Sequence, residues 1–301
     1  MRKIILTALV LGVTMPTISA QEELSFKNKK GQEVLPQQSD WAFGIAANPF
    51  LNYAGNLLNG TNGNTSPVFV NANGPSILNG NFSLNNIAFM GKYMKSSNTA
   101  YRVRFAGNLY NQTVSGFVAK DVLINNVLLP EFVEDKHNIR MSNVLLGAGI
   151  EKRKGSKRLQ GIYGAELFIG YVSRQDRFTY GNEMTTDFTA PASTNFASNV
   201  FVQGGRYYRT TYTNMGNTFL VGARGYVGAE YFITPKISLG GELGYSAAVA
   251  RRGKSYSSHE TFDFDNLTAE KVEFKNNNWN PSSFGLGLDN FNGGINLYFY
   301  F

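Results

Sequence analysis

Eight charged side chains occupy alternate positions within short apolar segments. Of all the charged residues in the chain, these are the best placed to interact with one another. They are four cations and four carboxylates: Lys92, Arg102, Arg104, Arg224, Glu151, Glu166, Glu230 and Glu242. If they line one interior, they could form an ion pathway or a gate. They could equally form a salt-bridged plug, because buried charges must be paired. The plug is the preferred interpretation, since a narrow interior is filled by its own side chains.

Two histidines, His137 and His259, are the only imidazoles in the chain. General acid–base chemistry needs such a group held by a rigid hydrogen-bonded partner. His137 lies beside Asp135 and Lys136, and both histidines are expected in solvated loops without such a partner. No catalytic residue is therefore predicted, and the chain is not expected to be an enzyme.

Near His259 lies an acidic stretch, Glu260, Asp263 and Asp265. It could bind Ca²⁺ loosely, but it lacks the glycine and terminal glutamate of a dedicated calcium loop. A solvated, charge-balanced loop is the preferred interpretation. No metal and no cofactor are predicted for the chain.

The composition favours long strands with polar loops. Charged residues make up 16% and aromatic residues 14%, with 32 glycines, whereas soluble domains carry about 25% charged residues. The absence of cysteine excludes disulfides, thiolate metal sites and a cysteine nucleophile. The net charge is +7, but the basic residues form short clusters such as 152–158. Because nucleic-acid binding needs a contiguous basic surface, no nucleic-acid partner is expected.

Residues 1–20 are predicted to be a cleavable secretory signal peptide. Arg2 and Lys3 are followed by the apolar stretch Ile4–Val13 and by the small pair Ser19-Ala20. The apolar stretch is too short for a membrane anchor, which needs about 20 residues. Residues 21–39 are expected to form a periplasmic N-terminal segment.

Alternation of apolar and polar residues decides the fold class. Tyr101, Val103 and Phe105 share one face of a predicted strand, and Arg102 and Arg104 share the other. A soluble sandwich also alternates, but glycine mixed with Arg and Glu would fill its core poorly. Apolar residues facing lipid and polar residues facing a lumen are typical of a membrane barrel.

Eight such strands are predicted in an antiparallel up-and-down transmembrane β-barrel over residues 40–301. They lie at about 40–50, 82–94, 100–112, 138–151, 160–173, 217–232, 237–250 and 285–301. Short turns at 95–99, 152–158 and 234–236 alternate with four long loops at about 51–81, 113–137, 174–216 and 251–284. This alternation predicts periplasmic turns, extracellular loops and two periplasmic termini.

The third long loop leaves the strand count open. Phe201–Gln203 and Tyr207–Tyr212 have strand character. They are interpreted as a hairpin that extends above the membrane, and ten strands remain the alternative.

The last strand carries its own signal. Ile295, Leu297, Phe299 and Phe301 alternate with polar or aromatic residues. This pattern resembles the terminal signature by which outer-membrane barrels are recognised by their assembly machinery.

In topology the chain resembles the eight-stranded OmpA/OmpX-type barrels. Four further segments look more like outer-membrane barrel proteins of Bacteroidota: Lys27–Gly31, Asp40-Trp41, Asn48–Tyr53 and Ile233–Ile237. The resemblance implies a cell outer-membrane location in a Gram-negative bacterium and no defined activity. It does not extend to a peptidoglycan-binding domain, because the sequence ends with the last strand.

The expected function is a non-enzymatic membrane scaffold with a plugged lumen. Its partners would be outer-membrane lipid and lipopolysaccharide, the barrel assembly machinery, and a surface ligand or protein bound by the long loops. A small porin for ions or solutes is the alternative, and a lipid-modifying outer-membrane enzyme is a more distant third.

Overall fold

The computed structural model describes residues 26–46, 87–121, 131–155, 157–196, 198–276 and 282–301, and every regular element within them is a β-strand. The predicted signal peptide, the first long loop and the Asn48–Tyr53 segment lie outside the described residues. In the described part, no helix is long and apolar enough to cross a membrane.

All pairings between strands are antiparallel, which confirms the all-β, up-and-down prediction. Each of the eight predicted segments overlaps a strand, although 47–50 and 82–86 of the first two segments lie outside the described residues. These strands are β1 (Trp41–Ala46), β2 (Ile87–Ser96), β3 (Thr99–Ala119), β4 (Phe132–Lys154), β5 (Leu159–Thr179), β8 (Thr218–Thr234), β9 (Ile237–Arg252) and β12 (Ser282–Tyr300).

Strands of this set that follow one another in the sequence also pair with one another in the sheet. Short turns join β2 to β3, β4 to β5, and β8 to β9. Where the third long loop intervenes, β5 pairs with β8. β12 pairs with β9 on one side and with β1 on the other, where Ala42 stands opposite Tyr300. The first and last strands of the set are therefore neighbours.

Four more strands lie in segments predicted to be loops. β6 (Val200–Gln203) and β7 (Arg206–Asn214) form the hairpin expected there. Its turn is Gly204-Gly205, where both residues have positive φ, as a two-residue hairpin turn requires. β10 (Ser255–Asp263) and β11 (Thr268–Asn276) form a second hairpin. The long loop predicted at about 251–284 therefore contains two strands that the sequence did not indicate.

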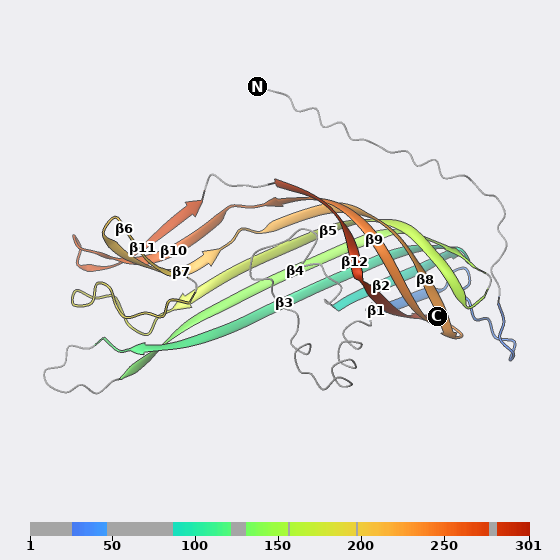
Figure 1. Ribbon diagram of the computed structural model, residues 1–301, viewed down its shortest axis with the longest axis horizontal. Helices are drawn as coiled ribbons and strands as arrows, with labels where there is room; N and C mark the ends of the chain where they lie inside the picture. Colours follow the sequence, from blue (N-terminus) through green and yellow to red (C-terminus); the bar gives the residue numbers. More distant parts are fainter. Residues whose placement is uncertain (1–25, 47–86, 122–130, 156, 197, 277–281) are drawn as a thin grey trace, which may run out of the picture.

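Strands β3, β4 and β5 are longer than predicted. β5 pairs with β8 from Leu159 to Val172 and then with β7 from Gln175 to Arg177. Figure 1 shows these three strands continuing from the region of β8 and β9 toward β7, β10 and β11. The second and third long loops are correspondingly shorter than 113–137 and 174–216, because much of each is strand.

The two faces of the strands differ sharply. On β8, Phe219, Val221, Val227 and Tyr231 are exposed, while Arg224 and Glu230 on the opposite face are buried. The same division recurs on β3, where Tyr101 and Val103 are exposed and Arg102 is buried.

The interior face carries two apolar clusters. One contains Val34, Leu35, Met94, Phe232 and Tyr300, close to the short turns. The other contains Leu145, Phe168, Leu220, Ala248 and Ala250, farther along the same strands. The charged residues of the interior lie between these clusters along β8, where Glu230 and Arg224 fall between Phe232 and Leu220.

The segment before β1 supplies the first cluster with Val34 and Leu35, both almost fully buried. The backbone oxygen of Val34 accepts a hydrogen bond from Lys236 in the β8–β9 turn, and Ser39 donates to Met94. Residues 26–40 thus pack against the turn end of the sheet.

Candidate functional site

The interior charges form one ion-pair network. The structure buries all eight residues singled out from the sequence, and places them on β2, β3, β4, β5, β8 and β9. Each occupies an inward position of its strand, because side chains alternate between the two faces.

The half of the network nearest the turns is organised by Lys92 and Glu230. The Lys92 Nζ lies 2.9 Å from Glu151 Oε1 and 3.0 Å from Glu230 Oε2. Glu230 Oε1 also accepts hydrogen bonds from Tyr300, at 2.7 Å, and from Ser238. A carboxylate with this many donors is stabilised in its ionised form.

The other half is organised by Arg102 and Glu242. Two guanidinium nitrogens of Arg102 donate to the two oxygens of Glu242 at 2.6 and 2.8 Å. This bidentate geometry is among the strongest ion-pair arrangements. Arg224 reaches Glu242 at 3.1 Å, and Arg104 pairs with Glu166.

The contacts cross the interior. Arg102 on β3 joins Glu242 on β9, and Lys92 on β2 joins Glu230 on β8. Arg102 also lies 3.5 Å from Glu151, which links the two halves. The result is a set of ion pairs between distant strands, with the charged groups in the middle of the interior.

Arg153 belongs to this network and was missed by the sequence interpretation, which ended the strand at Glu151 and assigned Arg153 to a basic turn. β4 continues to Lys154, so Arg153 takes the next inward position. It is buried and pairs with Glu230 and with Glu151, the latter at 3.2 Å. The described network therefore holds five cations and four carboxylates, and the expected balance of four against four is wrong.

Three tyrosines complete the site, and none of them belongs to the charge cluster that the sequence predicts. Arg153 donates to the Tyr300 hydroxyl. The Lys92 Nζ lies 3.9 Å from the Tyr298 ring centroid, and the Arg102 guanidinium carbon lies 4.6 Å from that of Tyr226. Aromatic faces attract cations, so these rings supply negative potential where a cation is in excess. The alternation of the last strand places Tyr298 and Tyr300 on the inward face, and both are buried.

His137 is not in a solvated loop, so that prediction is wrong. It lies within β4, which begins earlier than expected, and its ring is buried. Its Nε2 is 2.9 Å from Asp176 Oδ1, and the ring stacks on Phe178 with centroids 4.3 Å apart. The histidine is therefore buried inside the extension of the sheet, with a carboxylate partner.

His259 is likewise buried, within β10. Its Nε2 lies 2.7 Å from Ser257 Oγ, and its Nδ1 lies 3.1 Å from Thr210 Oγ1. Burial lowers the pKa of His259, which favours the neutral imidazole. Since Nδ1 faces a hydroxyl and not a carboxylate, an imidazolium there lacks the stabilisation that Ser–His catalysis uses.

Acidic residues beside His259 make ion pairs and hydrogen bonds within the fold. Glu260 pairs with Arg209 of β7. Asp263 accepts from the backbone of Asp265 and from Asn266 in the β10–β11 turn. Throughout the described ranges, no three His, Asp or Glu side chains are grouped so as to hold a metal ion.

The proposed assembly signal occupies the outer face of β12. Ile295, Phe299 and Phe301 are exposed, and Leu297 is half-buried, while Asn296, Tyr298 and Tyr300 between them are buried. Trp41 and Phe301 exchange two backbone hydrogen bonds of 2.9 Å.

The chain matches no protein-family description, no curated protein and no solved structure.

Proposed function

We propose that the chain is a non-enzymatic outer-membrane protein whose eight principal strands close into a transmembrane barrel with a sealed lumen. The barrel acts as a scaffold that holds the β6–β7 and β10–β11 hairpins at the cell surface, where they are available to a partner or ligand. The observation that carries this proposal is the buried ion-pair network, which joins strands across the interior.

Closure is supported by the pairing of β1 with β12, which gives both edges of the eight-strand set a neighbour. It is supported further by the short ion pairs between β2 or β3 and β8 or β9, because these strands are far apart in the pairing order. A closed sheet has no edge to recruit other chains.

A sealed lumen is supported by the apolar clusters on either side of the network. Val34 and Leu35 pack at the turn end, and Phe168 and Leu220 pack at the other. An eight-stranded barrel is just wide enough for its own side chains to fill. Ions would meet apolar packing before and after the charges.

Membrane insertion is supported by the exposed apolar face. On β8 this face runs from Phe219 to Tyr231. At about 3.3 Å per residue and a tilt of about 40°, this separation corresponds to a height of about 30 Å. An exposed apolar band of this height matches the hydrocarbon core of a bilayer.

Val227→Arg tests insertion, because Val227 lies near the middle of the exposed face of β8 and is 62% exposed. If this face contacts lipid, the substitution will lower the free energy of unfolding from vesicles by about 2–4 kcal/mol. The measurement is reversible denaturant unfolding in phosphatidylcholine vesicles, followed by tryptophan fluorescence.

The matched control is Val202→Arg on β6, where the valine is 69% exposed but lies in the hairpin beyond the barrel. It should unfold as the unsubstituted protein does. If Val227→Arg were equally neutral, the face would be in water, since surface substitutions usually change stability by less than about 0.5 kcal/mol.

The sealed lumen predicts that the purified protein will give no steady stepwise current in planar lipid bilayers. Insertion is checked in the same preparation by the shift of the folded band on an unheated gel. Steady single-channel steps from inserted protein would contradict the plug and favour the small-pore alternative.

The cellular part of the proposal is an exported protein placed in the outer membrane by the barrel assembly machinery, with Ile295, Leu297, Phe299 and Phe301 as the recognition signal. Both termini would face the periplasm, because Trp41 and Phe301 lie at the turn end of the sheet. Membrane fractionation of cells that express the full chain tests this location.

A further inference from the structure

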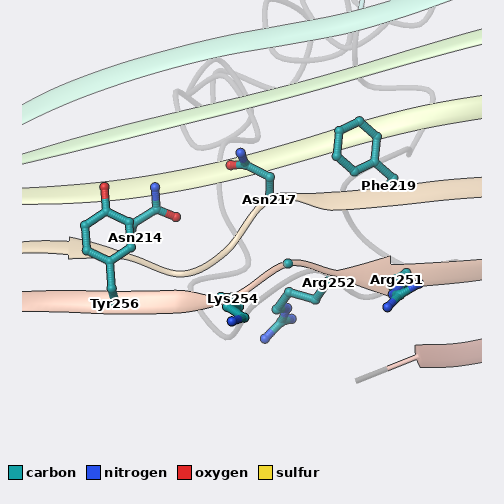
Figure 2. A pocket seen from close by; sticks show the side chains of 8 residues that line it. Asn214, Asn217, Phe219, Arg251, Arg252, Lys254 and Tyr256 are labelled. Carbon is teal, nitrogen blue, oxygen red and sulfur yellow. The ribbon is translucent and has the colours of Figure 1, made fainter. Parts of the chain in front are cut away.

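A basic cleft lies where β8, β9 and β10 meet, at the end of the sheet opposite Trp41 and Phe301. It has a volume of about 510 Å³ and is lined by Asn214, Asn217, Phe219, Arg251, Arg252, Gly253, Lys254 and Tyr256. Figure 2 shows the three cationic side chains on the same side of the chain that runs from β9 into β10.

These cations differ from the interior cations in their exposure to solvent and in their ion-pair partners. Arg251 and Lys254 are exposed and Arg252 is half-buried. In the part of the chain that is described, no carboxylate lies within ion-pair distance of any of the three, whereas all five cations of the interior network have at least one such partner. Three adjacent cations without a carboxylate repel one another, so an anionic ligand would stabilise the cleft.

The cleft adjoins the apolar outer face of the barrel. Arg251 stands directly opposite Phe219 across the β8–β9 ladder, and Val249 precedes it on the same outward face. Phe219 in turn contacts the Tyr171 ring, with centroids 5.1 Å apart. Aromatic side chains of this kind mark the border between hydrocarbon and headgroups in membrane barrels.

Along β9, the apolar Val249 therefore comes first, the outward-facing Arg251 comes next, and the rest of the basic cleft follows. Such an order places cationic groups at the level of lipid headgroups. Arginine binds phosphate through two parallel hydrogen bonds, and Lys254 adds a point charge. A single anion could not use both the cations and the apolar surface beside them, but a lipid with a phosphate headgroup could.

We propose that this cleft binds the phosphate group of an outer-leaflet lipid, with Arg251, Arg252 and Lys254 contacting the phosphate and Phe219 and Val249 contacting the acyl chains. The proposal rests on the proposed function, because it requires the exposed face of β8 and β9 to lie in a bilayer.

The test uses the full mature chain folded in phosphatidylcholine nanodiscs, with binding measured by native mass spectrometry. The probes are bisphosphorylated lipid A, the same lipid after enzymatic dephosphorylation, and inorganic phosphate. The test variant carries Arg251→Gln, Arg252→Gln and Lys254→Gln. Its matched control carries Lys95→Gln, Lys154→Gln and Lys157→Gln, three exposed cations at the opposite end.

The unsubstituted protein and the control should bind the phosphorylated lipid, and the test variant should bind it roughly 10- to 100-fold more weakly. The dephosphorylated lipid should bind weakly to all three. Equal binding of the phosphorylated lipid by test variant and control would overturn the proposal, as would displacement of the lipid by millimolar inorganic phosphate.

The same preparation separates this proposal from the proposed function. If the chain failed to insert into phosphatidylcholine nanodiscs, both proposals would fail together. Normal insertion with no difference between the variants would overturn the lipid site alone and leave the barrel scaffold standing.

Discussion

Glu230→Ala will lower the free energy of unfolding by about 3–5 kcal/mol, the cost of leaving buried charges without their partner. Glu230 is fully buried and accepts from Lys92, Arg153, Ser238 and Tyr300. Its removal leaves Lys92 and Arg153 with Glu151 as their carboxylate partner in a water-poor interior, and Arg102 also lies within ion-pair distance of Glu151. The measurement is denaturant unfolding in detergent micelles, followed by circular dichroism at pH 7.

The matched control is Glu273→Ala on β11, whose exposed side chain pairs with Lys275 at 3.4 Å. Exposed pairs of this kind contribute little, so no measurable change in unfolding is expected. If Glu230→Ala were as stable as the control, the interior would be hydrated enough to solvate Lys92 and Arg153. That result would count against the plug.

Gly164→Val will destabilise the folded sheet by about 3 kcal/mol or more, through overpacking at a position that cannot relax. A Cβ atom at Gly164 would lie 2.2 Å from the backbone oxygen of Ile150 and 2.7 Å from the Tyr226 hydroxyl. The first neighbour is backbone of the adjacent strand, so relief requires the two strands to separate. The unfolding midpoint in denaturant measures the effect.

Gly225→Val is the control, and it lies on the strand that pairs with this part of β5. Gly225 faces outward, and a Cβ atom there would meet nothing within 4 Å. Valine suits strands better than glycine does, so this variant should be as stable as the unsubstituted protein or more stable. Equal midpoints for the two variants would mean that the interior beside Tyr226 is not tightly packed.

The sequence predicts the strands of the proposed barrel well, because their two faces differ so strongly in chemistry. On β3, a shift of one residue would exchange Arg102 and Arg104 with Tyr101 and Val103, so the register follows from polarity alone. The interior charges could be named for the same reason.

The extension of the sheet could not be predicted in this way. β11 reads Thr-Ala-Glu-Lys-Val-Glu-Phe-Lys-Asn, with charges on both faces. The early part of β4 places Asp135 and His137 inward, where both form hydrogen bonds with polar groups from residues 174–199. Strands without an apolar face resemble loops in sequence, since only tertiary hydrogen bonds identify them.

Arg153 and the Val34-Leu35 pair were missed for different reasons. Arg153 follows Glu151 at the alternating position, but a run of basic residues around it suggested a turn. Val34 and Leu35 are adjacent and have no period, so nothing in the local pattern indicates burial. Their environment comes from Met94, Phe232 and Tyr300, which are distant in sequence.

The packing of residues 34–35 against residues 298–300 has a consequence for the order of folding. This cluster joins residues from the start of the described chain to residues at its end, so its contacts span a large sequence separation. Contacts of such sequence separation form late, because the intervening chain must first be ordered. If the eight strands close as proposed, an assembling chain would therefore have an unsealed interior until β1 and β12 meet. Joining the first and last strands and drying the interior would then be a single kinetic event.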